Sequence, residues 1–476
     1  MNSEPKPKPN IIYIDCTETF FSGLNTGIQR VVTQIIARSS LLSTKTGIPC
    51  VPVVGSCGKY YRLKDMQLKQ LRQKKILESL LKIKKWIRDI YYQFKTVFVS
   101  KHTSAAILNE EKNEERNDLS ALICKKIKNK GFLIKFEQKI RSFVGKLFSL
   151  MSKIVFKIII RNSPSVRFGS ESLLLVPDGF FGRYFDFVAL ENAFNARVNI
   201  IPLIYDLFPI THPELCHEEN VRIYPPILEK VLRISTGLMT ISESGLKDLQ
   251  DYLFSRHPKY SHLPLRFFYL GGDFRSITKS SDASDNSLNK LPIFLEKRRF
   301  YLVVGTIEPR KDHLTILSAF ELLWAEGFDA SLVFVGRIGW KCEEVLLKMK
   351  NSKYNNNQLH FLGSVDDEVL FTLYMNAEAL IFSSIAEGFG LPLVEAMNMK
   401  IPVIASDIPV FREIGGNYPY YFNVQSPVDL VRVVAEFDRL KLNSEFPQIL
   451  AKKWDSWDDA SLAYIQNALD IYSKIE

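Results

Sequence analysis

The sequence predicts an α/β fold with two domains, each a doubly wound parallel sheet, that face each other across a cleft. Short apolar runs alternate with helical patterns in two successive series along the 476 residues, and this alternation is typical of parallel α/β layers. The stretch RSITKSSDASDNSLNK separates the two series and has the composition of a linker. A chain of this length has room for two such domains.

The first series begins with NIIYIDCTE, which predicts a buried strand, and continues with FSGLNTGIQRVVTQIIARSS, a glycine loop that opens a helix. ESLLLVPDG, NIIPLIYDLFP and TGLMTISE each predict a short strand that ends in polar or turn residues, and LRFFYLGGDF closes the series. We expect residues 1–9 to be disordered, residues 10–275 to form the N-terminal domain, and residues 276–297 to form the linker.

The second series contains RFYLVVGTIEP, ASLVFVGR, QLHFLGSV, EALIFSSI and IPVIASDI, which predict at least five strands between helical patterns. We expect a C-terminal domain over residues 298–455. WDSWDDASLAYIQNAL predicts a last helix, residues 456–476, that crosses back onto the N-terminal domain. Because ligands of open parallel sheets bind beyond the carboxyl ends of the strands, we expect the chemistry in the cleft.

A basic segment, residues 59–161, interrupts the first series. From Lys59 to Ile160 there are 25 Lys and Arg against 9 Asp and Glu, although the net charge of the whole chain is only +10. In FEQKIRSFVGKLFSLMSKIVFKIII the lysines are spaced by four and seven residues, which keeps them on one helical stripe beside apolar residues. This pattern is typical of helices that lie on an anionic membrane surface. The alternative is a helical insertion that packs on the domain with solvated lysines.

The remaining composition indicates an intracellular protein. Six cysteines are scattered without a C-x-x-C pair, which argues against a disulfide framework or a zinc site. The start MNSEPKPKPN is polar, unlike a signal peptide, and no uncharged apolar run reaches the ~20 residues of a membrane span. We expect a cytoplasmic protein, peripheral at the inner face of the cytoplasmic membrane if the basic segment binds lipid.

The stretch AEGFGLPLVEAM carries two glutamates, Glu387 and Glu395, on either side of a Gly-x-Gly loop. The loop and the start of the following helix predict an anion site, and Glu395 is expected in the first turn of that helix. The amides expected to bind the anion belong to Gly388, Phe389, Gly390 and Leu391. Because carboxylates accept hydrogen bonds from hydroxyls, the pair favours a sugar and a ribose around a phosphate. Alternatively, Glu395 only favours the helix dipole.

The second motif is VGTIEPRKDH, in which Gly305 ends a strand and Arg310 and Lys311 follow where a helix starts. Two cations at the edge of the cleft can neutralise a departing diphosphate, a role that magnesium plays elsewhere. The C-terminal half has no D-x-D tripeptide, so no metal is expected. The alternative is a solvated helix start.

Residues 298–455 resemble the retaining glycosyltransferases of family 4, whose GT-B architecture consists of two Rossmann-like domains. GTIEPRKDH, LVFVGR, LHFLGSVDDEVL, EGFGLPLVEAM and PVIASDIP match in order. The resemblance implies that Glu387 contacts the donor sugar and Glu395 the donor ribose, while Arg310 and Lys311 hold the diphosphate. It also implies a nucleotide diphosphate sugar as donor substrate and no cofactor. Two further glycines are expected at the donor site, Gly305 and Gly336.

The N-terminal half resembles the same family in SGLNTGIQRV, YDLFPITHPE, TISESGLKDL and LGGDF. The residues expected to approach the diphosphate or the acceptor are Gly23, Thr26 and Gly27. Many members carry His-Asp where this chain has Tyr205 and Asp206, so the histidine taken to contact the donor sugar is absent. Asp206 is expected to supply the acceptor-facing carboxylate, and His212 is a candidate substitute for the histidine.

TGIQR and YDLFP look most like members that use GDP-mannose in bacterial surface polysaccharide assembly, such as O-antigen synthesis. The resemblance implies transfer of a hexose, with retention, to a glycan or lipid-linked acceptor; the residues expected to carry the chemistry are Glu387, Asp206, Arg310 and Lys311. The missing histidine favours one alternative, a non-catalytic GT-B-like partner that binds a nucleotide sugar within a glycosyltransferase complex. A dinucleotide oxidoreductase is disfavoured because no G-x-G-x-x-G with a downstream acid follows the first strand, and no nucleic acid partner is expected.

Overall fold

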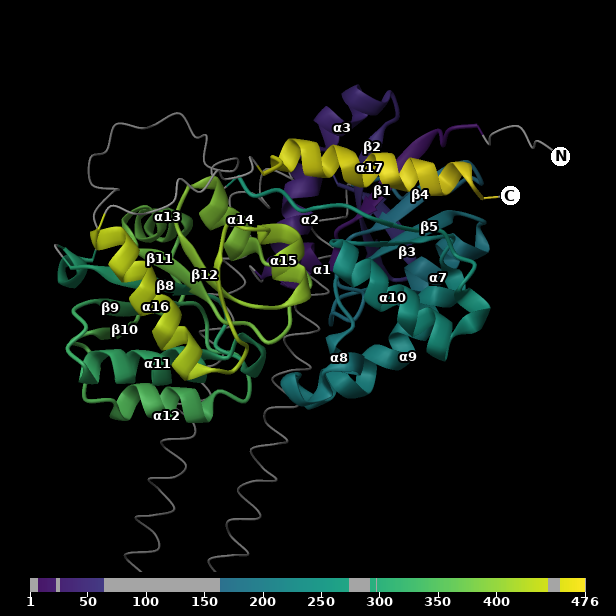
Figure 1. Ribbon diagram of the computed structural model, residues 1–476. Helices are drawn as coiled ribbons and strands as arrows, with labels where there is room; N and C mark the ends of the chain where they lie inside the picture. Colours follow the sequence, from purple (N-terminus) through teal and green to yellow (C-terminus); the bar gives the residue numbers. More distant parts are fainter. Residues whose placement is uncertain are drawn as a thin grey trace, which may run out of the picture. The chain divides into compact units, whose positions relative to one another are not determined.

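The computed structural model describes residues 7–22, 26–63, 163–273, 292–296, 298–443 and 454–475. Within these ranges the chain forms two sheets with helices between successive strands (Figure 1). The predicted α/β fold with two doubly wound parallel sheets is confirmed. Most of the basic segment, most of the predicted linker and Gly23 lie outside the described residues.

The first sheet has seven strands in the order β3-β2-β1-β4-β5-β6-β7. From β2 through β7 the neighbouring strands pair in parallel. β4 and β5 are buried along their whole length, as expected for a parallel sheet covered on both faces. The strands are β1 (Ile11–Asp15), β2 (Cys50–Ser56), β3 (Lys59–Arg62), β4 (Ser172–Val176), β5 (Asn199–Ile204), β6 (Leu238–Thr240) and β7 (Leu265–Phe267).

The helices of the N-terminal domain alternate with these strands. In α2 the residues Val31, Val32, Ile35 and Ile36 recur at helical spacing and are buried, which explains why this segment folds as a helix against the sheet. The helices are α1 (Thr17–Ser22), α2 (Gly27–Ala37), α3 (Ser39–Thr46), α7 (Phe187–Asn195), α8 (Phe208–Thr211), α9 (Glu218–Ile234) and α10 (Glu243–Arg256).

The strand β3 corrects the expectation that a helical insertion begins at residue 59. Lys59–Arg62 follow β2 after a two-residue turn in which both Cys57 and Gly58 have positive φ. Such turns connect the strands of β-hairpins. Within β3, Tyr60 is buried and donates a hydrogen bond from its hydroxyl to Asp15 at 2.8 Å, so the first residues of the basic segment belong to the sheet.

The second sheet has six parallel strands in the order β10-β9-β8-β11-β12-β13. Its strands are β8 (Phe300–Val304), β9 (Ser331–Val335), β10 (Leu359–Phe361), β11 (Ala379–Phe382), β12 (Val403–Ser406) and β13 (Tyr420–Phe422). Its helices are α11 (His313–Ala325), α12 (Glu343–Asn351), α13 (Asp367–Asn376), α14 (Leu391–Asn398), α15 (Pro409–Gly415) and α16 (Pro427–Leu442). The sequence predicts the first five of these strands.

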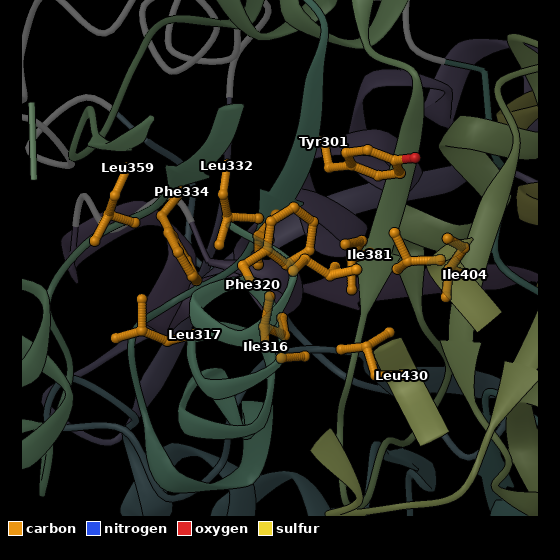
Figure 2. Packing of buried hydrophobic residues seen from close by; sticks show 14 of the residues in the cluster. Tyr301, Ile316, Leu317, Phe320, Leu332, Phe334, Leu359, Ile381, Ile404 and Leu430 are labelled. Carbon is orange, nitrogen blue, oxygen red and sulfur yellow. The ribbon is translucent and has the colours of Figure 1, made fainter. Parts of the chain in front are cut away.

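The core of the C-terminal domain lies between the second sheet and α11. Figure 2 shows Phe320 of α11 between side chains of the sheet, among them Leu332 and Ile381. The rings of Phe320 and Tyr301 are 5.4 Å apart, edge to face, an arrangement that aromatic pairs prefer. This packing fixes β8 and β11, the strands whose carboxyl ends carry the predicted donor motifs.

The last helix, α17 (Trp457–Ser473), lies along the N-terminal domain (Figure 1). The side chain of Asn467 donates a hydrogen bond to the carbonyl of Phe267 at 2.8 Å. Trp454, just before the helix, donates from its indole nitrogen to the carbonyl of Leu270 at 2.6 Å. The end of the chain therefore packs against the first sheet. In the described ranges, no helix combines the length and apolar content that crossing a membrane requires.

Candidate functional site

Glu387 lies in contact with the two cations that the sequence assigns to the donor site. Its Oε2 is 2.7 Å from Nη1 of Arg310, and its Oε1 pairs with Nζ of Lys311 and accepts a hydrogen bond from Ser384 at 2.8 Å. Only 9% of the Glu387 side chain is exposed. Residues 76 and 77 positions apart in the sequence therefore form one buried ionic cluster.

The residues of this cluster follow two neighbouring strands of the second sheet. Arg310 and Lys311 lie in a short 3₁₀ helix that follows β8, and Glu387 lies in the loop that follows β11. Two hydrogen bonds join the two loops. The amide of Ile385 donates to the carbonyl of Arg310 at 2.8 Å, and the side chain of Ser383 donates from Oγ to the carbonyl of Lys311 at 2.6 Å. The cluster therefore sits at the carboxyl edge of the second sheet, where such folds bind ligands.

Glu387 and Arg310 are held in their ionised forms, whereas burial lowers the pKa of Lys311. Burial opposes ionisation of Glu387, but Arg310 and Lys311 outweigh it and hold the pKa of the carboxyl at about 2. Burial likewise opposes the charge of Arg310, yet the neighbouring carboxylates of Glu387, Glu308 and Asp206 raise its pKa. An arginine with a raised pKa beside a carboxyl with a lowered one is the signature of a tight ion pair.

The two cations already have carboxylate partners. Besides Glu387, Arg310 pairs with Glu308, whose Oε1 lies 2.7 Å from its Nη2. Within the described residues, two cations thus face two carboxylates in direct contact. An incoming diphosphate must share the N–H donors of Arg310 and Lys311 with these acids.

The glycine loop before α14 has the backbone geometry of an anion site. Gly390 adopts a φ of +109°, and a Cβ there would lie 2.9 Å from the ring of Phe411, so this turn requires glycine. In the described part of the chain, the amides from residue 388 to residue 391 donate no hydrogen bond to another group. Pro392 stands in the first turn of α14, and Leu391 begins the helix, so these amides point out of a helix N-terminus.

The side chain of Phe389 lies away from this loop surface. It is 3% exposed, and its ring centroid is 5.9 Å from that of Trp454 and 6.3 Å from that of Tyr269. Its ring therefore packs among aromatic residues outside the ionic cluster. Only the main chain of Phe389 is placed to serve the predicted anion site.

Gly305 and Gly336 lie beside Lys311. A Cβ on Gly305 would be 3.4 Å from Cε of Lys311. A Cβ on Gly336, which has a φ of +154°, would be 1.8 Å from the carbonyl oxygen of Gly305. The two glycines thus let the loops after β8 and β9 touch next to the lysine.

A small cavity, with room for about one water molecule, adjoins the cluster and is lined from both domains. Its lining residues are Ile204, Tyr205, Asp206, Leu207, Phe208, Gly245, Asp248, Glu387 and Gly388. Asp206 follows β5 and faces the cluster: burial raises the pKa of this carboxyl, although Arg310 opposes the effect. The ring of Phe208 lies 5.3 Å from the guanidinium of Arg310. The structure therefore places Asp206 and Glu387 at the same cavity.

Tyr205 directs its side chain away from the cluster, into the N-terminal domain. Its hydroxyl donates to the carbonyl of Pro177 at 2.7 Å, so it does not replace the histidine that the resemblance expects. His212 is not among the cavity-lining residues of the described chain; one of its ring nitrogens lies 2.9 Å from the hydroxyl of Thr211. Neither side chain reaches Glu387.

Glu395 occupies a different position from the expected one. α14 begins at Leu391, so Glu395 lies in the second turn of the helix and not in the first. The side chain is 4% exposed, pairs with Arg30, and accepts a hydrogen bond from the hydroxyl of Tyr374 at 3.1 Å. Arg30 was not singled out from the sequence, although it belongs to the glycine-loop motif TGIQR.

The predicted residues of the glycine loop lie at the start of α2. Thr26 is the N-cap and Gly27 the first residue of this helix, one turn before Arg30. Nothing lies within 4 Å of a Cβ built on Gly27. Gly23 lies outside the described residues. Among the described residues, no group of three or more His, Cys, Asp or Glu side chains could hold a metal ion.

Comparison with known proteins shows which proteins the chain resembles. Residues 287–453 match the model of the glycosyl transferases group 1. The serotype-specific mannosyltransferase WbdA of Escherichia coli is 34% identical over 268 residues, 56% of this chain and 33% of WbdA. The O-antigen chain mannosyltransferase RfbU of Salmonella typhimurium is 35% identical over 140 residues, 29% of this chain and 38% of RfbU. The match thus spans well under half the length of either relative.

A third relative, the O-antigen chain mannosyltransferase B of Escherichia coli, is 27% identical over 226 residues, 46% of this chain and 55% of the relative. These similarities extend beyond the C-terminal domain, since WbdA matches more residues than the family model covers. The chain is therefore similar to the group 1 glycosyl transferases over residues 287–453 and to O-antigen and serotype-specific mannosyltransferases over longer or overlapping stretches.

Proposed function

We propose that the protein is a retaining glycosyltransferase that moves a hexose, mannose from GDP-mannose, to a glycan or lipid-linked acceptor in bacterial surface polysaccharide synthesis. The observation that carries the proposal is the ionic cluster of Glu387, Arg310 and Lys311 beside a cavity lined from both domains. The relatives that are named mannosyltransferases support the choice of sugar.

In this proposal the cations stabilise the leaving group. Arg310 and Lys311 already lie at the site before the donor arrives. Their N–H groups, which now contact Glu387 and Glu308, can bind a diphosphate instead. Preorganised donors aimed at developing negative charge are usually the largest electrostatic contribution to catalysis. The free amides of the loop before α14 add further donors for the same anion.

The two acids have separate tasks. Glu387 has a pKa of about 2 and stays ionised, so it accepts hydrogen bonds from hydroxyls of the donor sugar. Asp206 has a raised pKa because it is buried, and a carboxylate with a raised pKa is a better proton acceptor. We assign Asp206 to the acceptor hydroxyl, whose proton leaves as the new glycosidic bond forms.

A donor panel tests the proposal. Purified protein is titrated with GDP-mannose and UDP-glucose while the melting temperature and slow donor hydrolysis are followed; a bound donor raises the melting temperature by mass action. We expect GDP-mannose to bind and to be hydrolysed, and E387Q to lower hydrolysis at least ~100-fold. E436Q, which changes an exposed glutamate of α16, is the control. If a donor binds but is never turned over, the protein is a non-catalytic partner; if none binds, the proposal fails.

We also propose that the basic segment holds the enzyme at an anionic membrane surface. This rests on its charge and amphipathic pattern alone, because residues 64–162 lie outside the described residues. The flanking residues meet, since the amide of Arg62 donates to the carbonyl of Pro164 at 3.1 Å. A variant in which a short Gly-Ser linker replaces residues 64–162 is therefore feasible. It should no longer co-sediment with phosphatidylglycerol vesicles that retain the full chain; equal co-sedimentation would overturn the idea.

A further inference from the structure

Arg30 and Glu395 form an ion pair between the two domains. Arg30 lies on α2 of the N-terminal domain, and its Nη1 pairs with Oε1 of Glu395 on α14 of the C-terminal domain. The side chains are 22% and 4% exposed, respectively. The hydroxyl of Tyr374, which is itself fully buried, donates to the other oxygen of Glu395 at 3.1 Å. One oxygen of this carboxylate therefore accepts a hydrogen bond, and the other is in ionic contact with Arg30.

A buried carboxylate needs such partners to remain ionised. Burial raises the pKa of Glu395 above its usual range, Asp367 on α13 adds to this, and Arg30 and the hydroxyl of Tyr374 offset only part of the rise. A buried charge without a partner takes up a proton and loses its charge instead. Among the described residues, Arg30 is the cation that pairs with Glu395, and it comes from the opposite domain.

Other contacts join the two domains around α14, the helix that carries Glu395. Ser242, the N-cap of α10, donates from its hydroxyl to the carbonyl of Gly388 at 2.8 Å. The amide of Ser244 donates to a carboxylate oxygen of Glu413 on α15 at 2.8 Å. The Arg30 pair is thus part of an interface that surrounds the loop and helix of the candidate donor site.

We infer that Arg30 is a positioning residue for the donor nucleotide, acting from the N-terminal domain through Glu395. It pairs with this carboxylate and favours its charged form, so that the ribose-binding group is complete only while the two domains are in contact. The inference rests on the proposed function, in which Glu395 accepts hydrogen bonds from the ribose hydroxyls. A carboxylate has lone pairs for several donors, so Arg30 and Tyr374 can stay bound when the ribose arrives.

Binding measurements on three arginine variants test the inference. We expect R30M to raise the dissociation constants of GDP and GDP-mannose, measured by calorimetry, at least ~10-fold, and R30K to restore them to within ~3-fold of the parent protein. R38M is the matched control, because Arg38 ends the same helix and pairs with Asp458 of α17, remote from Glu395 in the sequence. R38M should lower the melting temperature and leave both dissociation constants unchanged.

A double variant separates a positioning role from a merely structural one. If Arg30 acts through Glu395, R30M adds less than ~2-fold to the loss already caused by E395Q. The loss in R30M should also be larger at pH 6 than at pH 8, because without its cation the pKa of Glu395 rises further and the carboxyl takes up a proton more readily at the lower pH. The other titratable groups that face Glu395, Tyr374 and Asp367, are unchanged in this comparison.

The outcomes are distinguishable. If the parent protein binds neither GDP nor GDP-mannose, the proposed function fails and the inference falls with it. If the parent protein binds them and R30M binds equally well, the proposed function stands and Arg30 has no role in donor binding. If R30M costs as much in the E395Q background as in the parent, Arg30 does not act through Glu395, and the inference is overturned.

Discussion

The carbonyl oxygen of Tyr205 lies so close to Gly388 that a Cβ on Gly388 would be only 2.5 Å from it. Tyr205 follows β5 of the N-terminal domain, and Gly388 follows Glu387 in the donor loop. The hydroxyl of Ser242 bonds the carbonyl of Gly388 from the same side. The two domains therefore meet backbone to backbone at the candidate site, and this contact has room for glycine alone.

Replacing Gly388 should separate the domains at this point. In G388A the new methyl group cannot fit against the Tyr205 carbonyl, since both are fixed main-chain atoms, so the donor loop and Asp206 must move apart. A displacement of about 1 Å between reacting groups can cost ~100-fold in rate. We expect kcat for donor hydrolysis to fall ~10- to 100-fold in steady-state assays.

G169A is the control for the glycine change. Nothing lies within 4 Å of a Cβ on Gly169, and its φ does not favour glycine. This variant should match the parent protein in both kcat and melting temperature. A G388A variant with parental kcat would show that the contact with Tyr205 does not form in the active enzyme.

Two buried acids of the N-terminal domain should make stability depend on pH. Burial raises the pKa of Asp178 to about 7 and that of Asp15 to about 6. Because these values exceed the unfolded value of 3.8, their contribution to stability is fully present below pH 3.8 and is lost as the pH rises through 6 to 7. The free energy of unfolding should therefore fall between pH 5 and pH 8.

The variant D178N removes one of these titrations. From pH 5 to pH 8 its free energy of unfolding, from urea titrations, should gain about 2–4 kcal/mol relative to that of the parent protein. D251N, which changes an exposed residue of α10, should leave the pH profile parallel to the parental one. Parallel profiles for D178N as well would mean that Asp178 is ionised at the same pH in the folded and unfolded chain.

Most of the donor cluster could be predicted from the sequence because its residues stand in short motifs. Glu387 follows β11, and Arg310 and Lys311 follow β8; strands that neighbour in a parallel sheet bring their carboxyl ends together. The expectation that all three meet therefore needed only the strand assignments. The sequence predicts Glu395 in the first turn of α14, but the helix begins at Leu391, so Glu395 lies in its second turn.

The contacts between the domains could not be predicted from the sequence. Arg30 and Glu395 are 365 positions apart, and their pairing depends on how two separately folded sheets are brought together. The strand β3 could not be predicted from the sequence for another reason. Its Lys and Arg residues match the composition of the basic segment, and the strand is specified by the turn at Cys57 and Gly58 and by the buried Tyr60.

The docking of α17 should depend on Trp457. This side chain is 1% exposed, and its amide donates to Asp273 at 2.5 Å. Large-to-small changes of a buried tryptophan typically cost about 3–5 kcal/mol. We expect W457A to lower the free energy of unfolding by that amount in urea titrations. F254A, which removes a side chain that is 79% exposed, should change it by less than about 0.5 kcal/mol; similar losses in both variants would contradict a buried anchor.

Lys311 should control both the rate and its dependence on pH. In K311M the carboxylate of Glu387 loses one of the two cations that hold its pKa at about 2, so its pKa rises while burial continues to oppose ionisation. The diphosphate also loses one donor, which typically costs ~100- to 1,000-fold in kcat. Donor hydrolysis measured from pH 4 to pH 9 should therefore show a lower plateau and an acid limb shifted to higher pH, whereas K311R should keep the parental limb. K348M, which removes a lysine that pairs with Glu321 on the surface, should leave both features unchanged. A K311M profile that is lowered uniformly would mean that Lys311 serves the diphosphate without setting the charge of Glu387.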